Sequence, residues 1–292
     1  MKTSEELKKI VQEKYAEIAQ GENISCCGSA PGVPEVYNIM TDDYSEVQGY
    51  TSDADLGLGC GLPTQFAKIQ KGDTVIDLGS GAGNDCFIAR HETGGTGKVI
   101  GIDFTEAMIN KARSNAEKLR FNNVEFRQGD IENMPVSNDV ADVIVSNCVL
   151  NLVPDKEKVI KEIYRSLKPG GHFSISDIVL VGDLPEKLKS DAEMYAGCVA
   201  GAIQKEVYLD HIRKTGFQNI SIQKEKPIII PDELLDRYLD PTEKEDFKKG
   251  TTGIFSITVF AQKPGIKPLK SVTDAIEIQS SCCGPVNTSG CC

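Results

Sequence analysis

Residues 74–83 read TVIDLGSGAG, and this stretch decides the fold that the rest of the chain must adopt. An apolar run ending at Leu78 predicts a strand, and three glycines in Gly-x-Gly-x-Gly spacing predict a tight turn before a helix. Glycine lets the backbone approach a ligand closely, and the amide groups at a helix start are free to bind one. The stretch therefore predicts a strand, a turn and a helix that together form a ligand site.

Beyond this stretch, apolar strands alternate with amphipathic helices. A helix is predicted to begin at Pro154 and to end at residues 168–171 (KPGG). Two further apolar runs, 219–222 and 253–260, are candidates to extend the sheet. This alternation is typical of an α/β fold with a mostly parallel sheet flanked by helices. The main predicted strands are residues 74–78, 98–103, 124–128, 141–147 and 172–177.

Charge and composition limit the possible partners. The 292 residues carry a formal net charge of −11, so a nucleic-acid backbone would be repelled and no nucleic-acid partner is expected. No apolar run approaches the roughly 18 residues of a membrane span, and residues 1–9 lack a secretory signal. We expect a cytoplasmic protein that makes no membrane contact, acts as a monomer and keeps its ten cysteines reduced.

Two carboxylates mark the predicted ligand site. Asp103 ends the next strand, about 20 residues beyond the glycine turn, where an acidic side chain accepts hydrogen bonds from ribose hydroxyls. Asp77 lies just before the turn, where a carboxylate meets the ammonium group of an amino acid. The absence of Gly-Lys-Ser and Gly-Lys-Thr excludes a phosphate-loop ATPase. The spacing therefore indicates a nucleoside site.

The chain here resembles the class I S-adenosylmethionine-dependent methyltransferases, over about residues 60–225. The resemblance lies in DLGSGAG at 77–83, GID at 101–103, GDI at 129–131 and LKPGG at 167–171. It implies a Rossmann-like fold and S-adenosylmethionine as the methyl donor. It also implies which residues contact this donor. In order from its methionine end to the ribose, the adenine and the methyl-transfer pocket, they are Asp77, Gly79, Ser80, Gly81, Gly83, Asp103, Phe104, Met108, Asp130, Ile131 and Asn147.

Segments flank this Rossmann-like domain on both sides. Thr3 and Glu6 have the spacing of a capping box at the start of a helix. Residues 21–61 are rich in Gly, Ser, Asp and Pro without periodicity, which favours an irregular functional lid. The predicted division is an N-terminal helix and cap at 1–70, the methyltransferase domain at 71–215, a C-terminal extension of the fold at 216–263 and a flexible Cys-rich tail at 264–292.

Cysteine is more abundant than the structure of such a domain requires. Cys148 directly follows the fourth predicted strand, and ligands bind at the carboxyl ends of the strands in open α/β sheets. Topology therefore places Cys148 at the site, but it does not place Cys60 or Cys198. None of the three histidines lies in a recognisable catalytic motif.

The segments that carry these three cysteines are similar to the diagnostic segments of arsenite methyltransferases. They read LGCG at 58–61, SNCVLNLVPDK at 146–156 and GCVAGA at 197–202. The resemblance implies that Cys60, Cys148 and Cys198 hold arsenite or methylarsenite opposite the donor. Trivalent arsenic is thiophilic, and three thiolates leave its lone pair exposed as the nucleophile. Because arsenic has no proton to lose, no general base is required.

The same resemblance implies a redox cycle that involves cysteine. Methylation formally raises arsenic to the pentavalent state, and the enzyme's cysteines return electrons to it by forming a disulfide. A thiol reductant of the glutathione or thioredoxin type then resets the enzyme. A further upstream cysteine takes part, and both Cys26 and Cys27 qualify. The doublets at 282–283 and 291–292 either pass arsenite inward or have no catalytic role.

Two other functions fit part of the pattern. A methyltransferase acting on a quinone, a sterol or another small molecule would share the cofactor segments but would not need the three cysteines. A thiol protein that sequesters zinc or arsenic without turnover would use the cysteines alone. Zinc is disfavoured because the chain has adjacent doublets and isolated cysteines in place of Cys-x2-4-Cys knuckles.

Overall fold

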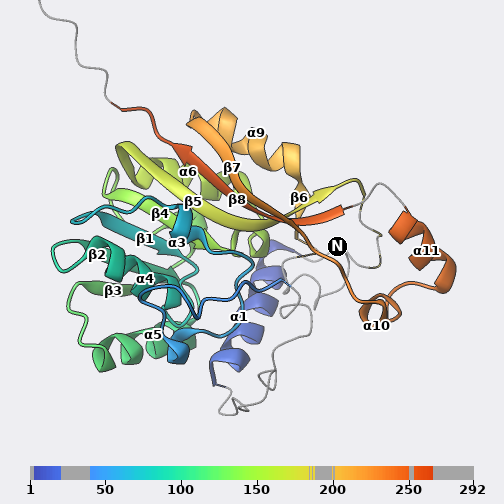
Figure 1. Ribbon diagram of the computed structural model, residues 1–292, viewed down its shortest axis with the longest axis horizontal. Helices are drawn as coiled ribbons and strands as arrows, with labels where there is room; N and C mark the ends of the chain where they lie inside the picture. Colours follow the sequence, from blue (N-terminus) through green and yellow to red (C-terminus); the bar gives the residue numbers. More distant parts are fainter. Residues whose placement is uncertain are drawn as a thin grey trace, which may run out of the picture.

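The computed structural model describes residues 3–20, 40–183, 185, 187, 199, 201–249 and 253–265. These residues form one sheet of eight strands that is flanked by helices (Figure 1). The strands are β1 Thr74–Leu78, β2 Lys98–Asp103, β3 Val124–Gln128, β4 Ala141–Asn147, β5 Leu167–Val181, β6 Ile203–Gln204, β7 Gln218–Pro227 and β8 Gly253–Gln262.

The strand order is β3-β2-β1-β4-β5-β8-β7, with β6 beside β5. Strands β1 to β5 run parallel to one another, whereas β8 is antiparallel to both β5 and β7. The predicted α/β fold with a mostly parallel sheet is confirmed, and β1 to β4 have the predicted bounds. The apolar runs at 219–222 and 253–260 lie in β7 and β8, so they do extend the sheet.

The predicted start of the helix after β4 is wrong. Helix α6 spans Lys156–Ser166 and does not begin at Pro154. Its N-cap is Asp155, whose carboxylate accepts a hydrogen bond from the Lys158 amide at 2.9 Å. An aspartate in this position satisfies an amide that has no partner within the helix, which a proline at the first helical position does not do.

The predicted bounds of the fifth strand are also too narrow. Strand β5 begins at Leu167 because this residue already pairs with Ala141 of β4. An irregularity in the register follows this pair. The KPGG segment at 168–171 therefore belongs to the strand. It continues to Val181, which pairs with Gly253 of the antiparallel strand β8. Pairing with a distant segment therefore lengthens the strand at both ends.

Helices cover both faces of the sheet, because side chains in a strand alternate between faces. Val75 of β1 packs with α4 (Asn84–Thr93) and α5 (Glu106–Lys118), whereas Ile76 packs with α6 and α9 (Lys205–Thr215). Figure 1 shows these two pairs of helices on opposite sides of the strands. The shorter elements are α3 Pro63–Phe66, α10 Asp232–Leu235, α11 Pro241–Lys249, and the 3-10 helices η1 Ser52–Ala54, η2 Ile131–Asn133 and η3 Leu150–Leu152.

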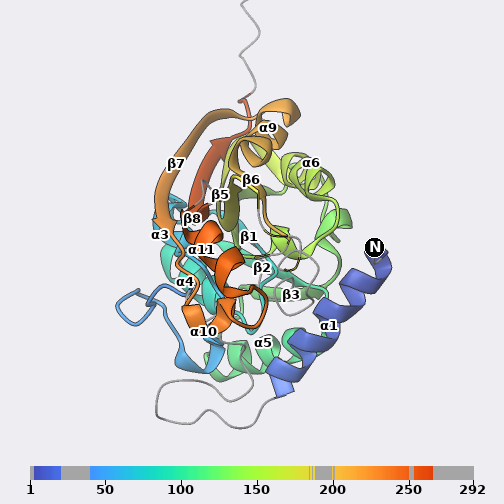
Figure 2. The same ribbon diagram turned by 90° about the vertical axis from the view of Figure 1, so that its right-hand side faces the viewer.

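The N-terminal helix α1 (Ser4–Gln20) begins with the predicted capping box. The Thr3 hydroxyl accepts a hydrogen bond from the Glu6 amide at 3.2 Å, and the Glu6 carboxylate accepts one from the Thr3 amide at 2.6 Å. Helix α1 lies beside α5 (Figure 2). None of the described helices is both long and apolar enough to cross a bilayer.

A separate cluster of buried side chains joins the N-terminal and C-terminal segments to the sheet. It includes Val11 of α1, Met40, Cys60, Cys148 and Ile254 of β8. Burial of apolar area holds these distant segments together. Of the predicted lid, residues 40–61 contain only the short η1, while 21–39 lie outside the described residues, as does the tail beyond residue 265.

Candidate functional site

The candidate site lies where the strand order reverses. Strand β1 pairs with β2 on one side and with β4 on the other, so the chain leaves the carboxyl end of β1 between two diverging connections. Ligands of open α/β sheets bind in the crevice at such a switch point. Two neighbouring cavities open here, and both are lined by Tyr15, Gly79, Asp103 and Val149.

The first cavity contains the glycine turn. Gly79 and Gly81 have φ angles of 66° and 50°, in the left-handed region that favours glycine. A Cβ atom at Gly79 would overlap the Val149 side chain, so a larger residue does not fit. The Gly81 amide donates a hydrogen bond to the Asp103 carboxylate at 3.0 Å. The turn and the end of β2 therefore form one wall of the cavity.

Three buried acidic residues, Asp77, Asp85 and Asp103, line the first cavity and favour a ligand with a positive charge. Burial, followed by the charge of Asp85, raises the pKa of Asp77 well above its usual value. Burial also raises the pKa of Asp103, and it raises that of Asp85 to about 6. No lysine or arginine among the described residues forms an ion pair with any of the three. A ligand with a positive charge would relieve this unfavourable burial.

The second cavity is more apolar and extends toward α1. Phe104, Ile131 and Leu152 line it, and Asp130 and Lys8 lie at its border. The Lys8 ammonium group pairs with Asp130 at 2.6 Å and also with Glu132. The Asp130 carboxylate accepts a hydrogen bond from the Glu132 amide at 2.8 Å. An apolar slot with polar groups at its edge suits a flat heteroaromatic ring such as adenine.

Two residues of α1 line the cavities although no sequence motif points to them. Lys8 lines the second cavity and Tyr15 lines both. The helical spacing of Tyr15 with Ile18 and Val11 indicates only a buried face. Which part of the sheet that face covers depends on long-range packing, and no local motif encodes it.

Nine of the eleven predicted cofactor residues line one cavity or the other, and two do not. Gly83 has a φ angle of 101° and precedes α4, where a Cβ atom would meet Phe87 and Phe126. Met108 is wholly buried within α5. The nine that line a cavity are Asp77, Gly79, Ser80, Gly81, Asp103, Phe104, Asp130, Ile131 and Asn147.

Two of the predicted arsenic ligands lie close to the first cavity. Cys60 and Cys148 are 0% and 2% exposed and belong to the same buried cluster, and Cys148 also lines the cavity. Cys148 has a φ angle of 60°, which is uncommon for a residue other than glycine. Its amide donates to the Ser176 carbonyl at 2.8 Å. Cys26, Cys27 and Cys198 lie outside the described residues.

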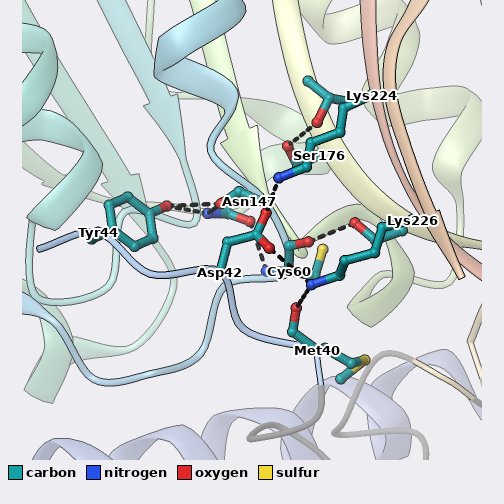
Figure 3. A network of polar contacts seen from close by, with 11 residues as sticks. Met40, Asp42, Tyr44, Cys60, Asn147, Ser176, Lys224 and Lys226 are labelled. Atoms are coloured by element: carbon teal, nitrogen blue, oxygen red, sulfur yellow. Dashed lines mark hydrogen bonds and ion pairs between the residues drawn. The ribbon is translucent and has the colours of Figure 1, made fainter. Parts of the chain in front are cut away.

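The segment before Cys60 is held to the C-terminal strands by an ion-pair cluster (Figure 3). The Asp42 carboxylate pairs with Lys224 at 2.7 Å and with Lys226 at 2.8 Å. Burial opposes ionisation, but the hydrogen bonds from these two lysines lower the pKa of Asp42 overall. Lys226 also donates to the Met40 carbonyl at 3.0 Å. Strand β7 therefore holds residues 40–42 in place.

A further buried acid gives a stability prediction. Burial raises the pKa of Asp177 to about 7, although the charge of Lys156 partly offsets it. The unfolded state releases this proton near pH 4 and the folded state only near pH 7, so stability falls as pH rises through this window. We expect Asp177→Asn to raise the free energy of unfolding by up to about 4 kcal/mol at pH 8. At pH 4 it should have little effect.

Urea unfolding of both proteins at pH 4 and pH 8 would check this prediction. The exposed Asp246 of α11 supplies a matched Asp→Asn control that should change stability at neither pH. A loss of stability at pH 8 in Asp177→Asn would contradict the proposed cost of the buried carboxylate.

Comparison with known proteins agrees with this geometry. Residues 69–227 match the family described as "Methyltransferase domain". With the strand order and the glycine turn at the switch point, this match defines a class I methyltransferase. The arsenite methyltransferase of Halobacterium salinarum is 42% identical over 231 residues, which are 75% of this chain and 59% of that protein. The crystal structure of CrArsM, an arsenic(III) S-adenosylmethionine methyltransferase from Chlamydomonas reinhardtii, has 32% identity and a TM-score of 0.61.

The similarity to CrArsM covers 79% of this chain and 74% of that one. The chain therefore belongs to the arsenite methyltransferase family. It spans about three-fifths of the length of the Halobacterium relative. The demethylmenaquinone methyltransferase of Lactococcus lactis is 32% identical, but the match covers only 48% of this chain.

Proposed function

We propose that this protein transfers methyl groups from S-adenosylmethionine to trivalent arsenic held by cysteine thiolates. The observation that carries the proposal is the position of Cys60 and Cys148 in one buried cluster, beside a cavity lined by Asp77, Asp85 and Asp103. Membership of the arsenite methyltransferase family supports the same acceptor.

The residues of the two cavities fit the parts of the donor. Asp77 would bind the ammonium group of the donor. The acidic residues that line the first cavity would favour the positively charged sulfonium. Asp103, which closes β2, would accept hydrogen bonds from the ribose hydroxyls. Phe104 and Ile131 would enclose the adenine ring in the apolar cavity. Loss of the sulfonium charge on transfer weakens this attraction and favours product release.

Cys60, Cys148 and Cys198 would supply the three thiolates for arsenic. Cys198 is followed by Val199, which is buried in the cluster that contains the other two cysteines. The arsenic lone pair attacks the methyl carbon in line with the sulfonium, so an arsenic–carbon bond forms as the sulfur–carbon bond breaks. Arsenic rises formally from the trivalent to the pentavalent state, and the donor leaves as S-adenosylhomocysteine.

A second round of methylation requires two electrons per arsenic. We propose that a pair of enzyme thiolates provides them by forming a disulfide, and that Cys26 or Cys27 is one partner. A thiol reductant of the glutathione or thioredoxin type would then reduce that disulfide.

Arsenic speciation tests the proposed function. The purified protein would be incubated with arsenite, S-adenosylmethionine and a thiol reductant, and the products would be separated by chromatography with mass detection. Methylated arsenic that requires S-adenosylmethionine is the expected result. Arsenite left unchanged by protein that binds S-adenosylmethionine would overturn the proposal and favour a small-molecule acceptor, as in the demethylmenaquinone relatives.

A further inference from the structure

The segment that carries Cys60 is held by a side chain at the border of the donor cavity (Figure 3). The Asn147 side-chain oxygen accepts a hydrogen bond from the Cys60 amide at 3.0 Å. The Asn147 side-chain nitrogen donates to the Gly61 carbonyl at 2.8 Å. One amide group therefore holds the backbone on both sides of the Cys60 thiol.

The same amide connects this backbone to the floor of the cavity through Tyr44 and Asp85. Tyr44 is 4% exposed, and its hydroxyl group donates to the Asp85 carboxylate at 3.0 Å. The Asn147 side-chain nitrogen donates to the Tyr44 hydroxyl and lies 3.2 Å from the Asp85 carboxylate. Tyr44, Asp85 and Asn147 all line the first cavity. These three residues form what we call the Tyr44 relay.

The segment that carries Cys60 packs closely against Asn147, Ser176 and Ser256. A Cβ atom at Gly59 would lie 2.6 Å from the Asn147 side-chain nitrogen, and one at Gly61 would lie 2.5 Å from the Ser176 hydroxyl. On the other side, the Ser256 hydroxyl donates to the Cys60 carbonyl at 2.5 Å. We therefore expect a displacement of Asn147 to move Cys60 as well, since close-packed interiors transmit strain.

At the cavity end of the Tyr44 relay, the negative charge of the buried acids is not neutralised by any described side chain. Asp85 and Asp77 are both buried, and burial raises the pKa of each. The charge of Asp85 raises the pKa of Asp77 further, and no cationic side chain of the described residues pairs with either. A bound donor brings an ammonium group to this position. That charge reduces the repulsion between the carboxylates and leaves Asp85 in place as an acceptor for Tyr44 and Asn147.

We propose that the Tyr44 relay couples the two binding sites, so that a donor in the cavity raises the affinity of the Cys60 site for arsenite. This inference rests on the proposed function. Coupling between ligands is reciprocal, so arsenite must raise the affinity for the donor by the same factor. Tyr44 is a positioning residue in this scheme, because it acts on arsenic only through Asn147 and the backbone of Cys60.

Equilibrium dialysis with and without saturating S-adenosylhomocysteine tests the coupling. This product keeps the ammonium group but transfers no methyl, and bound arsenic is quantified by mass detection. We expect S-adenosylhomocysteine to increase the arsenite affinity of the wild-type protein about fivefold or more, which is within the usual range of coupling between sites. In Tyr44→Phe the increase should fall below about twofold. Calorimetric titration of S-adenosylhomocysteine in the presence and absence of arsenite should give the same factor.

Tyr50→Phe is the matched control, because this ring stacks on Tyr44 at 6.5 Å but lies outside the relay. It should keep the wild-type coupling. Asp85→Asn supplies a second test from the cavity side and should also lose it. Full coupling in Tyr44→Phe, or equal arsenite affinity with and without the product in the wild type, would overturn the inference. Absence of any arsenite binding or methylation in the wild type would instead reject the proposed function.

Discussion

Cys148→Ser should lower arsenite-dependent methyl transfer by about 100-fold or more, equivalent to roughly 2.7 kcal/mol. A serine hydroxyl is a hard ligand that stays protonated at neutral pH, so it cannot replace a thiolate on a thiophilic element. Cys148 is buried and lines the first cavity. Cys198→Ser should cause a similar loss if the three-thiolate site is correct.

Measurements on the same variants separate loss of the acceptor from loss of the fold. Cys148→Ser should retain the rise in melting temperature that S-adenosylmethionine causes in the wild type, because its donor residues are intact. Cys86→Ser is a useful control for arsenite binding. Its thiol is buried on α4, donates to Asp77 at 3.2 Å and should not contribute to arsenite affinity. Wild-type turnover with arsenite in Cys148→Ser would rule out its role as a ligand.

Asp77→Asn should weaken the binding of S-adenosylmethionine by about 30-fold or more, which corresponds to roughly 2 kcal/mol. The amide keeps the shape of the carboxylate but loses the charge that attracts the ammonium group. The ligand-free protein should gain stability at pH 8. Burial raises the pKa of Asp77, so the carboxylate costs the folded state stability above the pH at which the unfolded state ionises, and a neutral amide removes this cost. Affinity and stability are thus expected to change in opposite directions.

Calorimetric titration of S-adenosylmethionine and thermal melts of the ligand-free protein would measure the two effects. Asp142→Asn is a matched substitution at an acid that pairs with Lys168 near the start of β4, away from the cavity. It should leave donor affinity unchanged. If Asp77→Asn bound the donor with wild-type affinity, the carboxylate would have no part in holding the ammonium group.

The local pattern was sufficient to predict most of the fold. The bounds of β1 to β4 and the capping box of α1 were correct because both depend on neighbours in the sequence, on apolar runs and on the Thr3–Glu6 spacing. The start of α6 was wrong because two local signals competed and the Asp155 cap prevailed over Pro154. The length of β5 was wrong because its last residues depend on pairing with β8.

The candidate site was also only partly predictable from the sequence. The sequence alone determined the glycine turn, the two acids at the ends of β1 and β2, and Cys148 at the end of β4, because the carboxyl ends of parallel strands necessarily share one edge of a sheet. Only the tertiary structure decided that Tyr15 and Lys8 border the two cavities and that Asn147, itself bonded to Tyr44, holds the backbone of Cys60. These contacts join residues up to 124 positions apart. They arise from the packing of whole segments, which no local spacing encodes.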